Sequence, residues 1–216
     1  MSKQAGIVDL GGDAQSWEWL DGKERVTLVN LDARCLEGHR PSTVADVVAT
    51  PFADRAFEVV FSNSVIEHLG TEERQNAFAN EVRRLSRSGY FVQTPNKWFP
   101  IEPHYLAFYV QLVPLRVRPA VIRWATLWGW MAKPSRALCE QRCREIRLLG
   151  SREMHRLFPE AKIYRERFFG FTKSFIAVWH ASCPVQSVPP VRQRSVPQPR
   201  KEIGKVARGG PASELW

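Results

Sequence analysis

Short apolar segments alternate with longer helix-like segments through the first half of this 216-residue chain, and this alternation restricts the folds it can adopt. The stretch 71–87 carries Ala77, Phe78, Val82 and Leu85 at the spacing of one helical face. Strands that alternate with helices predict crossover connections and a mainly parallel sheet. Five runs are typical of the strands: 6–10, 26–32, 43–48, 57–63 and 89–96.

The second half of the chain predicts a helical insert followed by an antiparallel strand pair. Residues 103–148 are helix-like, with prolines at 103, 114, 119 and 134 as breaks. A short helix is predicted over 151–158 with Ser151 as its N-cap. The runs 161–170 and 173–180 are typical of two strands joined by a turn. Together these segments predict an α/β, Rossmann-like fold with a mainly parallel seven-stranded sheet, helices on both faces and a C-terminal antiparallel pair.

Composition changes sharply near residue 184. Beyond it proline, arginine, glutamine, glycine and serine dominate, and apolar periodicity ends. A segment of this kind has too few apolar residues to join a core. We therefore predict one domain over 1–183, with the insert 103–148 inside it, and a disordered, basic, proline-rich tail over 184–216.

Charge is distributed unevenly along the chain. Residues 1–106 carry a formal net charge of −4, whereas 107–148 carry +6, 149–183 carry +3 and 184–216 carry +4. The basic half is expected to face an anionic partner. Neither a signal peptide nor an apolar run long enough to span a membrane is visible, and the four cysteines lack zinc-ligand spacing. These features predict a cytoplasmic protein without a bound metal.

Polar residues and glycines at the ends of the predicted strands mark a candidate cofactor site. Ligands in open parallel sheets bind beyond the carboxyl ends of the strands. Asp32 lies 23 residues after Asp9, which suits the acid that accepts both ribose hydroxyls. Asp46 and Phe52 suit an adenine amine and an adenine face. The candidate cofactor residues are Asp9, Gly11, Gly12, Asp32, Asp46, Phe52, Ser62 and Asn63.

These segments resemble class I S-adenosylmethionine-dependent methyltransferases of the broad group related to ubiquinone-biosynthesis methyltransferases (methyltransferase type 11). "DLGG" is similar to the first motif of that family, and "LVNLD" to its second strand with the ribose-binding acid. The most specific piece is "ADVVATPFADRAFEVVFSNSVIEHL", residues 45–69. The resemblance covers about residues 5–183 and implies S-adenosylmethionine as cofactor and methyl transfer as activity.

The first motif departs from the family pattern D-x-G-x-G-x-G. Counted from Asp9, the chain has Gly11 but then Asp13 and Gln15 at the later glycine positions. Glycine there permits positive φ and close backbone approach. S-adenosylmethionine presents a small carboxylate rather than a pyrophosphate, so the departure argues mainly against a dinucleotide. A degenerate methyltransferase-like binding protein without activity remains an alternative.

The acceptor side of the site is predicted to follow the fifth strand. His104 is the first candidate for a base that takes a proton from a hydroxyl acceptor, with Glu102 to orient it. His68, which follows the fourth strand, is the second candidate. Each of these histidines also has an alternative interpretation as a structural cap or core contact.

The chemistry of residues 105–133 bears on the acceptor. Aromatic side chains are mixed there with Arg116, Arg118, Arg123 and Lys133, as in a membrane-surface segment or a site for an anionic, greasy acceptor. A nucleic-acid substrate is not favoured, because no recognition motif is visible. We predict methylation of a small-molecule or glycan acceptor, most readily on oxygen. N- or C-methylation, and a lipid-linked acceptor with peripheral membrane contact at the inner face, are alternatives.

Overall fold

The computed structural model describes residues 6–102, 107–110, 113–114 and 116–181; for 101–102 and 107–108 it describes the backbone alone. The chain divides into two units, residues 1–186 and 187–216, and all described residues belong to the first. The tail over 184–216 lies outside the described residues, so its predicted boundary near residue 183 stays a proposal.

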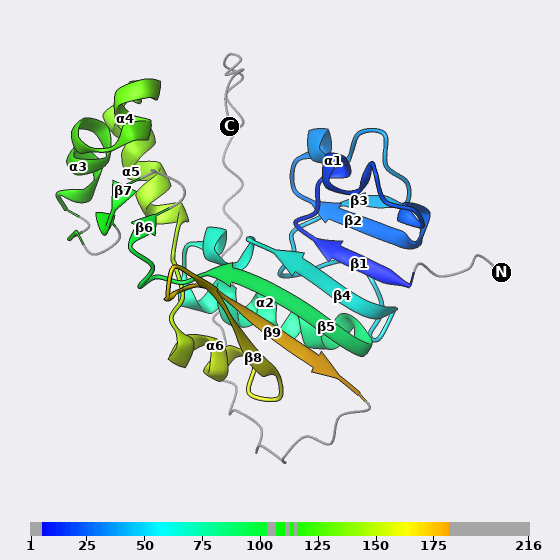
Figure 1. Cartoon of the computed structure of the whole chain (residues 1–216). Coiled ribbons are helices and arrows are strands. Elements are labelled where there is room, and N and C mark those ends of the chain that lie inside the picture. Colours follow the sequence, from blue (N-terminus) through cyan, green and yellow to red (C-terminus); the bar gives the residue numbers. More distant parts are fainter. Residues whose placement is uncertain (1–5, 103–106, 111–112, 115, 182–216) are drawn as a thin grey trace, which may run out of the picture. The chain divides into compact units, whose positions relative to one another are not determined.

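A seven-stranded sheet forms the centre of the first unit, with the strand order β3-β2-β1-β4-β5-β9-β8 (Figure 1). Strands β1 to β5 run parallel, β9 pairs antiparallel with β5, and β8 pairs antiparallel with β9. The predicted fold class is confirmed. The strands are β1 Ile7–Leu10, β2 Val26–Asn30, β3 Ser42–Val44, β4 Phe57–Asn63, β5 Ser86–Pro95, β8 Lys162–Phe168 and β9 Phe171–His180.

Helices and short turns connect the strands and build the insert. The α-helices are α1 Ala14–Trp17, α2 Glu72–Leu85, α3 Arg118–Ala125, α4 Leu127–Ala132, α5 Arg136–Glu145 and α6 Ser151–Leu157. Single 3₁₀ turns are η1 Lys23–Arg25, η2 Ala33–Leu36 and η3 Ile66–Leu69, and a two-stranded pair is formed by β6 Ile101–Glu102 and β7 Ala107–Phe108. Helices α3, α4 and α5 make up most of the predicted insert, which we call the cap.

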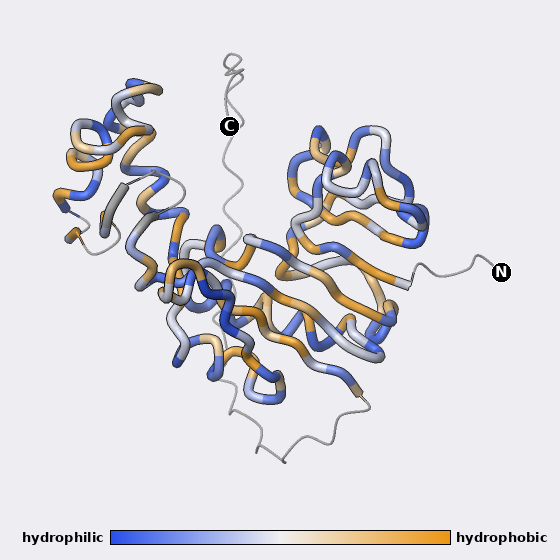
Figure 2. Tube along the Cα trace, viewed as in Figure 1, coloured by the Kyte–Doolittle hydropathy of each residue, from blue (hydrophilic) through white to orange (hydrophobic). Residues whose placement is uncertain are grey.

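The main core lies between one face of the sheet and helices α2 and α6 (Figure 1). Figure 2 shows the apolar residues concentrated along the central strands. Helix α2 begins at the cap residue Thr71, whose hydroxyl accepts a hydrogen bond from the Arg74 amide, and buries its Phe78, Val82 and Leu85. Burial of such side chains contributes roughly 1.5–3 kcal/mol each.

The opposite face of the sheet carries a smaller core over β1 and β2. Val26 and Leu28 pack there with Leu36 of η2, and Trp17 of α1 lies against them. Trp17 also meets Phe61 of β4 edge-on, with ring centroids 5.8 Å apart. The short helix α1 therefore lies on the same face as the side chain of Asp9, whose register partners are Leu28 and Phe61.

Several element boundaries differ from the sequence-based expectation, and two of them have a clear physical cause. Strand β3 ends at Val44 rather than near residue 48, because the Asp46 side chain accepts from the Val48 amide and starts a turn. The N-cap of α6 is Gly150 rather than Ser151. There the carboxylate of Glu153 accepts from the Gly150 amide at 2.8 Å. An acid inside the first turn therefore satisfies the backbone N–H of the cap residue.

Candidate active site

The carboxyl ends of four strands meet at one edge of the sheet. Strands β3, β2, β1 and β4 are neighbours, and the chain order reverses between β1 and β4. Such a reversal is the usual ligand position in an open parallel sheet. Gly11, Asp32 and Asp46 follow β1, β2 and β3, and Asn63 ends β4, so the fold brings these candidates to this edge.

The loop after β1 requires glycine at two successive positions. Gly11 has a φ of +84°, and its amide donates to the Val29 carbonyl at 2.7 Å. A Cβ atom on Gly11 would lie 2.4 Å from a methyl carbon of Val65, and one on Gly12 would lie 2.6 Å from the carboxylate of Asp9. "DLGG" therefore encodes a turn that packs tightly against Val65, just beyond β4, and against the carboxylate of Asp9.

The positions where the family pattern has further glycines need no conformational freedom in this chain. Asp13 has an extended backbone, with φ −127° and ψ 134°, and it is the N-cap of α1. Its carboxylate accepts from the Gln15 amide at 2.6 Å. Gln15 itself lies inside the helix. The departure from the motif thus exchanges a glycine turn for a capped helical turn.

Gly11→Ala is expected to destabilise the fold by about 2–5 kcal/mol. It combines a left-handed residue, at about 1–2 kcal/mol, with overpacking, at about 1–3 kcal/mol. The matched control is Gly38→Ala, because Gly38 has a φ of +79° and nothing within 4 Å of its added Cβ. Urea denaturation of both variants checks this, and equal losses of stability would show that the contact with Val65 is not tight.

Asp9 is a buried acid that supports this loop. Only 4% of the residue is exposed, and its carboxylate accepts from the indole N–H of Trp17 at 2.8 Å. Burial raises the pKa of Asp9 to about 6. The hydrogen bond from Trp17 acts in the opposite direction and only partly offsets this rise. The carboxylate also fills the space beside Gly12. Asp9 therefore holds α1 on the sheet.

Asp9 should make the stability of the cofactor-free protein fall as pH rises from about 4 to about 6. The pKa of Asp9 is higher in the folded than in the unfolded chain, so the folded state binds the proton more tightly. The free energy of folding that this proton contributes is lost as the pH rises through the two pKa values. A shift of about two units corresponds to about 3 kcal/mol.

The measurement compares the wild type with Asp9→Asn, whose amide oxygen still accepts from Trp17. Other titrating groups cancel in the difference between the two unfolding free energies. That difference should change by about 2–3 kcal/mol between pH 4 and pH 7. Parallel curves would contradict a raised pKa of Asp9.

Asn30 fixes the loop to the end of β2, and sequence analysis did not select it. Its side-chain amide donates to the Gly12 carbonyl at 3.0 Å, and its oxygen accepts from the Asp32 amide at 3.0 Å. One side chain thus links the glycine turn to the ribose-binding candidate. The sequence feature that could have indicated Asn30 is its side-chain amide at the end of the strand-like run "VTLVN".

Asp32 is partly exposed at the edge and forms an ion pair with Arg34. It is the N-cap of η2, and its carboxylate accepts from the Arg34 amide at 3.0 Å. The Arg34 guanidinium donates to both carboxylate oxygens, the shortest contact being 2.7 Å. These hydrogen bonds lower the pKa of Asp32, so the group is an anionic acceptor at neutral pH. The Arg34 side chain is 79% exposed, which leaves it free to turn away.

Asp46 occupies the corresponding position after β3. Its carboxylate accepts from the Val48 amide at 3.2 Å and from the guanidinium of Arg74, in α2, at 3.0 and 3.1 Å. Both acids proposed for the nucleoside are therefore held by arginines in this structure. An adenine amine or a ribose hydroxyl would replace a guanidinium donor on the same oxygens.

The remaining cofactor candidates lie in different environments. Ser62 is fully buried, and its hydroxyl donates to the Leu10 carbonyl at 2.8 Å, which joins β4 to β1. Asn63 is exposed at the end of β4. Phe52 lies away from the edge: its ring packs edge-on against Phe57, the first residue of β4, with centroids 4.9 Å apart. Apolar packing at the amino end of β4 accounts for Phe52, so we do not retain it as an adenine contact.

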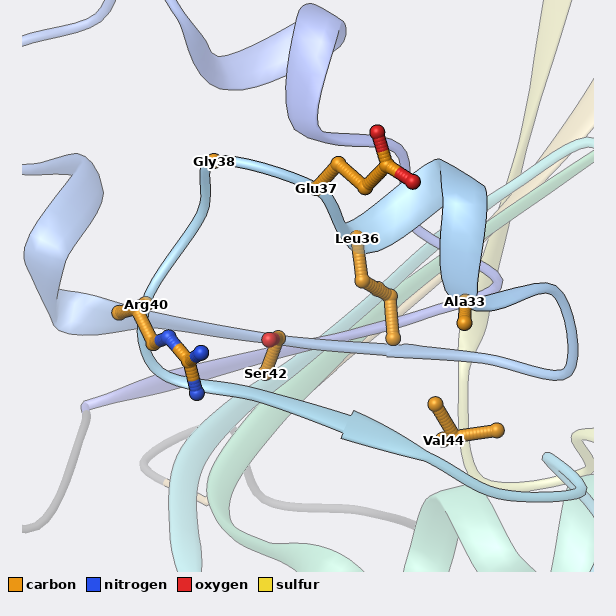
Figure 3. A pocket seen from close by; sticks show the side chains of 7 residues that line it. All are labelled: Ala33, Leu36, Glu37, Gly38, Arg40, Ser42 and Val44. Carbon is orange, nitrogen blue, oxygen red and sulfur yellow. The ribbon is translucent and has the colours of Figure 1, made fainter.

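A hollow lies between η2 and β3 (Figure 3). It follows the face of β3 and shares with the edge only its end near Ala33, which comes directly after Asp32, and Val44. None of the candidate cofactor residues lines it. Its lining residues are Ala33, Leu36, Glu37, Gly38, Arg40, Ser42 and Val44.

His68 lies on η3, just past the end of β4, beside a buried acid. The side chain of His68 is 45% exposed, and its Nε2 is 4.0 Å from Oε1 of Glu67. Glu67 is fully buried, and its other carboxylate oxygen accepts from the Thr94 hydroxyl at 2.9 Å. Sequence analysis missed Glu67, because nothing in "IEHL" distinguishes a buried acid from a solvated one. The structure therefore gives His68 an acidic neighbour.

The two residues proposed for proton removal after β5 are described only in part. His104 lies outside the described residues, and for Glu102 only the backbone, in β6, is described. The preceding segment is well anchored: the Asn96 amide donates to the Lys173 carbonyl at 2.9 Å, and its side chain donates to the Thr172 carbonyl at 2.8 Å. The pairing of Glu102 with His104 stays a proposal.

Comparison with known proteins gives a family match within the first half of the chain. A family model described as "Methyltransferase domain" matches residues 8–93, which contain the glycine turn, the acids Asp32 and Asp46, and η3. The chain carries a class I S-adenosylmethionine-dependent methyltransferase domain. Its cofactor is therefore S-adenosylmethionine. A comparison with curated proteins gives no match.

Two solved structures are similar to this chain along most of its length. One is a putative Zn-dependent alcohol dehydrogenase from Rhodobacter sphaeroides, with a TM-score of 0.54 and 13% identity over 81% of this chain and 83% of that one. Another is the 1,6-didemethyltoxoflavin-N1-methyltransferase of Burkholderia thailandensis with bound S-adenosylhomocysteine, with a TM-score of 0.48 and 13% identity over 80% and 68%. At 13% identity, the similarity to the structure from Rhodobacter sphaeroides shows the fold alone.

The chemistry of the methyltransferase edge suits its cofactor. Two carboxylates, on Asp32 and Asp46, offer acceptors to the ribose hydroxyls and the adenine amine, and the glycine turn permits close approach of the backbone. Both acids already accept charge-assisted hydrogen bonds, so their lone pairs point toward donors at this edge. We propose Asp32 as the ribose contact and Asp46 as the adenine contact.

Proposed function

We propose that the chain transfers the methyl group of S-adenosylmethionine to a hydroxyl of a small-molecule or glycan acceptor. The cofactor supplies an activated methyl carbon on a sulfonium, and the protein aligns the acceptor with it. The supporting observation is the imidazole of His68 beside the buried carboxylate of Glu67 at the edge that carries both nucleoside acids. An imidazole at this edge can take the proton that a hydroxyl loses, and we propose His104 as the first candidate for that base and His68 as the second.

The charge of the cap supports an anionic acceptor. Residues 107–148 carry a net charge of +6, and exposed cations on and beside the cap helices include Arg116, Lys133, Arg136 and Arg144. Phosphate or carboxylate groups on an acceptor would meet these side chains. Anionic sugars and phosphate-linked carriers are therefore the first acceptors to test.

A lipid-linked acceptor is the second candidate, and exposed aromatic side chains on the cap favour it. Trp124, Trp130 and Met131 are 77%, 75% and 68% exposed. Among the described residues, no helix is long and apolar enough to cross a membrane. We propose that the cap touches the inner face of a membrane without spanning it, as amphipathic segments with aromatic and cationic side chains do.

A methyl-transfer screen tests this function. The full chain is incubated with cofactor labelled in its methyl group and with neutral sugars, anionic sugars or lipid-linked sugars, and the labelled product is analysed by mass spectrometry and NMR. The expected product is a methyl ether, formed best on anionic acceptors. A methyl group on nitrogen or carbon would contradict the hydroxyl assignment and support the N- or C-methylation alternative.

A further inference from the structure

The β8–β9 hairpin ends in exposed aromatic residues at the same edge as the candidate site. Its turn consists of Phe169 and Gly170, between the paired residues Phe168 and Phe171. Phe168, Phe169 and Phe171 are 51%, 87% and 55% exposed. Large apolar side chains gathered in this way usually mark an interaction site.

Turn chemistry does not explain the phenylalanine at this position. Both loop residues have positive φ, +46° at Phe169 and +82° at Gly170. Two-residue hairpin loops with this pattern favour asparagine followed by glycine, and a bulky residue there is strained. The Phe169 ring touches only its neighbour Phe168, edge-on with centroids 4.7 Å apart, among the ring contacts of the described residues. The residue therefore contributes neither a favourable turn nor a buried contact.

A second aromatic segment lies beside the turn and widens the apolar surface. The ring of Phe99 meets that of Phe168, with centroids 6.5 Å apart. Its neighbour Trp98 is 59% exposed, and the Lys97 ammonium lies 5.4 Å from the centre of the indole. We call Trp98, Phe99, Phe168, Phe169 and Phe171 the aromatic tip.

Cations surround the aromatic tip. Arg165 and Arg167 are exposed on β8, and no ion pair joins either of them to another described residue. Lys173 on β9 pairs with Glu166, the acid on the same hairpin. The cap repeats this chemistry, because the Arg123 guanidinium lies 5.1 Å from the ring centre of the exposed Trp124.

We propose that the aromatic tip inserts into the headgroup region of a membrane that contains anionic lipids. Aromatic rings at a protruding turn, ringed by arginine and lysine, suit an interface with apolar chains below and negative charge at the surface. A convex tip enters a fluid layer without a matching hollow, whereas a protein partner would need one. This inference extends the membrane contact proposed for the cap, and it places the bilayer beside the acceptor edge.

Vesicle co-sedimentation of the full chain tests the proposal. Vesicles of phosphatidylcholine are compared with vesicles of phosphatidylcholine and phosphatidylglycerol. The key variant is Phe169→Asn, which installs the favoured turn residue and should keep or raise the melting temperature. We expect it to weaken binding to the anionic vesicles at least about fivefold, since a ring leaves the apolar layer.

Two matched controls complete the experiment. Trp19→Ser removes an 88% exposed ring from the acidic half and should leave vesicle binding unchanged. Arg165→Ser combined with Arg167→Ser should weaken binding to the anionic vesicles and not to the neutral ones. Unchanged binding of Phe169→Asn, or no vesicle binding by the wild type, would overturn the proposal.

Methyl transfer to a water-soluble acceptor serves as a separate readout. Phe169→Asn should leave it unchanged. If that variant loses transfer to a soluble acceptor while binding vesicles normally, the tip is an acceptor contact and the membrane proposal is wrong. A chain that binds vesicles but transfers no methyl group would instead contradict the proposed function alone.

Discussion

His104→Ala is expected to lower turnover at least about a hundredfold while leaving the affinity for S-adenosylmethionine nearly unchanged. A general base contributes about 10²–10⁴-fold when it removes a proton in the transition state. The loss should therefore fall on the acceptor step and not on cofactor binding. The wild-type rate should also rise with pH through the pKa of one group in the range usual for histidine, roughly 6–7.

Two further histidine variants make this result interpretable. His155→Ala removes an exposed histidine on α6 whose ring is hydrogen-bonded to the Ser151 carbonyl of its own helix, at 2.7 Å, and it should leave turnover unchanged. His68→Ala tests the second candidate, which lies beside Glu67. If His104→Ala keeps more than about half of the activity and His68→Ala loses a hundredfold, the base is His68. If neither variant loses activity, alignment alone carries the reaction.

Asp32→Ala is expected to weaken cofactor binding by about one to two decades. The variant leaves the ribose hydroxyls without a charged acceptor, and hydrogen bonds to charged groups contribute about 1.5–3 kcal/mol. Calorimetric titration with S-adenosylhomocysteine measures the change. Unchanged affinity would contradict the assignment of the acid that follows β2.

The arginine partners of the acids supply the controls for this variant. Arg34→Ala removes the guanidinium that holds Asp32 and keeps the carboxylate, so it should keep or raise the affinity. Asp54→Ala removes another exposed acid in an arginine pair, with Arg84 in the last turn of α2, and should leave affinity unchanged. A loss in Arg34→Ala equal to that in Asp32→Ala would show that the pair, and not the acid, supports the site.

The sheet was predictable because its strands are short apolar runs with clear boundaries. β4 occupies the predicted residues 57–63, and α2 begins directly after Thr71, the first residue of the predicted helical stretch 71–87. The predictions failed where a local hydrogen bond between a side chain and the backbone decides a boundary. Glu153 makes Gly150 the cap of α6, and the turn at Asp46 shortens β3. Such contacts leave no periodic signal in the sequence.

The candidate site was predictable in its acids and less so in what supports them. Asp32 and Asp46 lie at or near the carboxyl ends of predicted strands, which was enough to select them although β2 and β3 end earlier than predicted. Asn30 and Glu67 depend on partners in other elements, Gly12 for the first and Thr94 for the second. Phe52 packs against Phe57. The sequence around it, "TPF", does not show whether the ring makes such an apolar contact or contacts a nucleoside. The Arg34 and Arg74 pairs also required the three-dimensional structure.

Hydrogen–deuterium exchange with and without S-adenosylhomocysteine tests most directly whether the cofactor binds at the carboxyl edge of β1 to β4. Binding there predicts new protection in residues 9–15, 30–34, 44–50 and 62–68, the segments that follow these four strands. The amino ends of the same strands should exchange as before. A fully folded chain that shows no ligand-dependent protection in these segments, or shows it only elsewhere, would contradict the account.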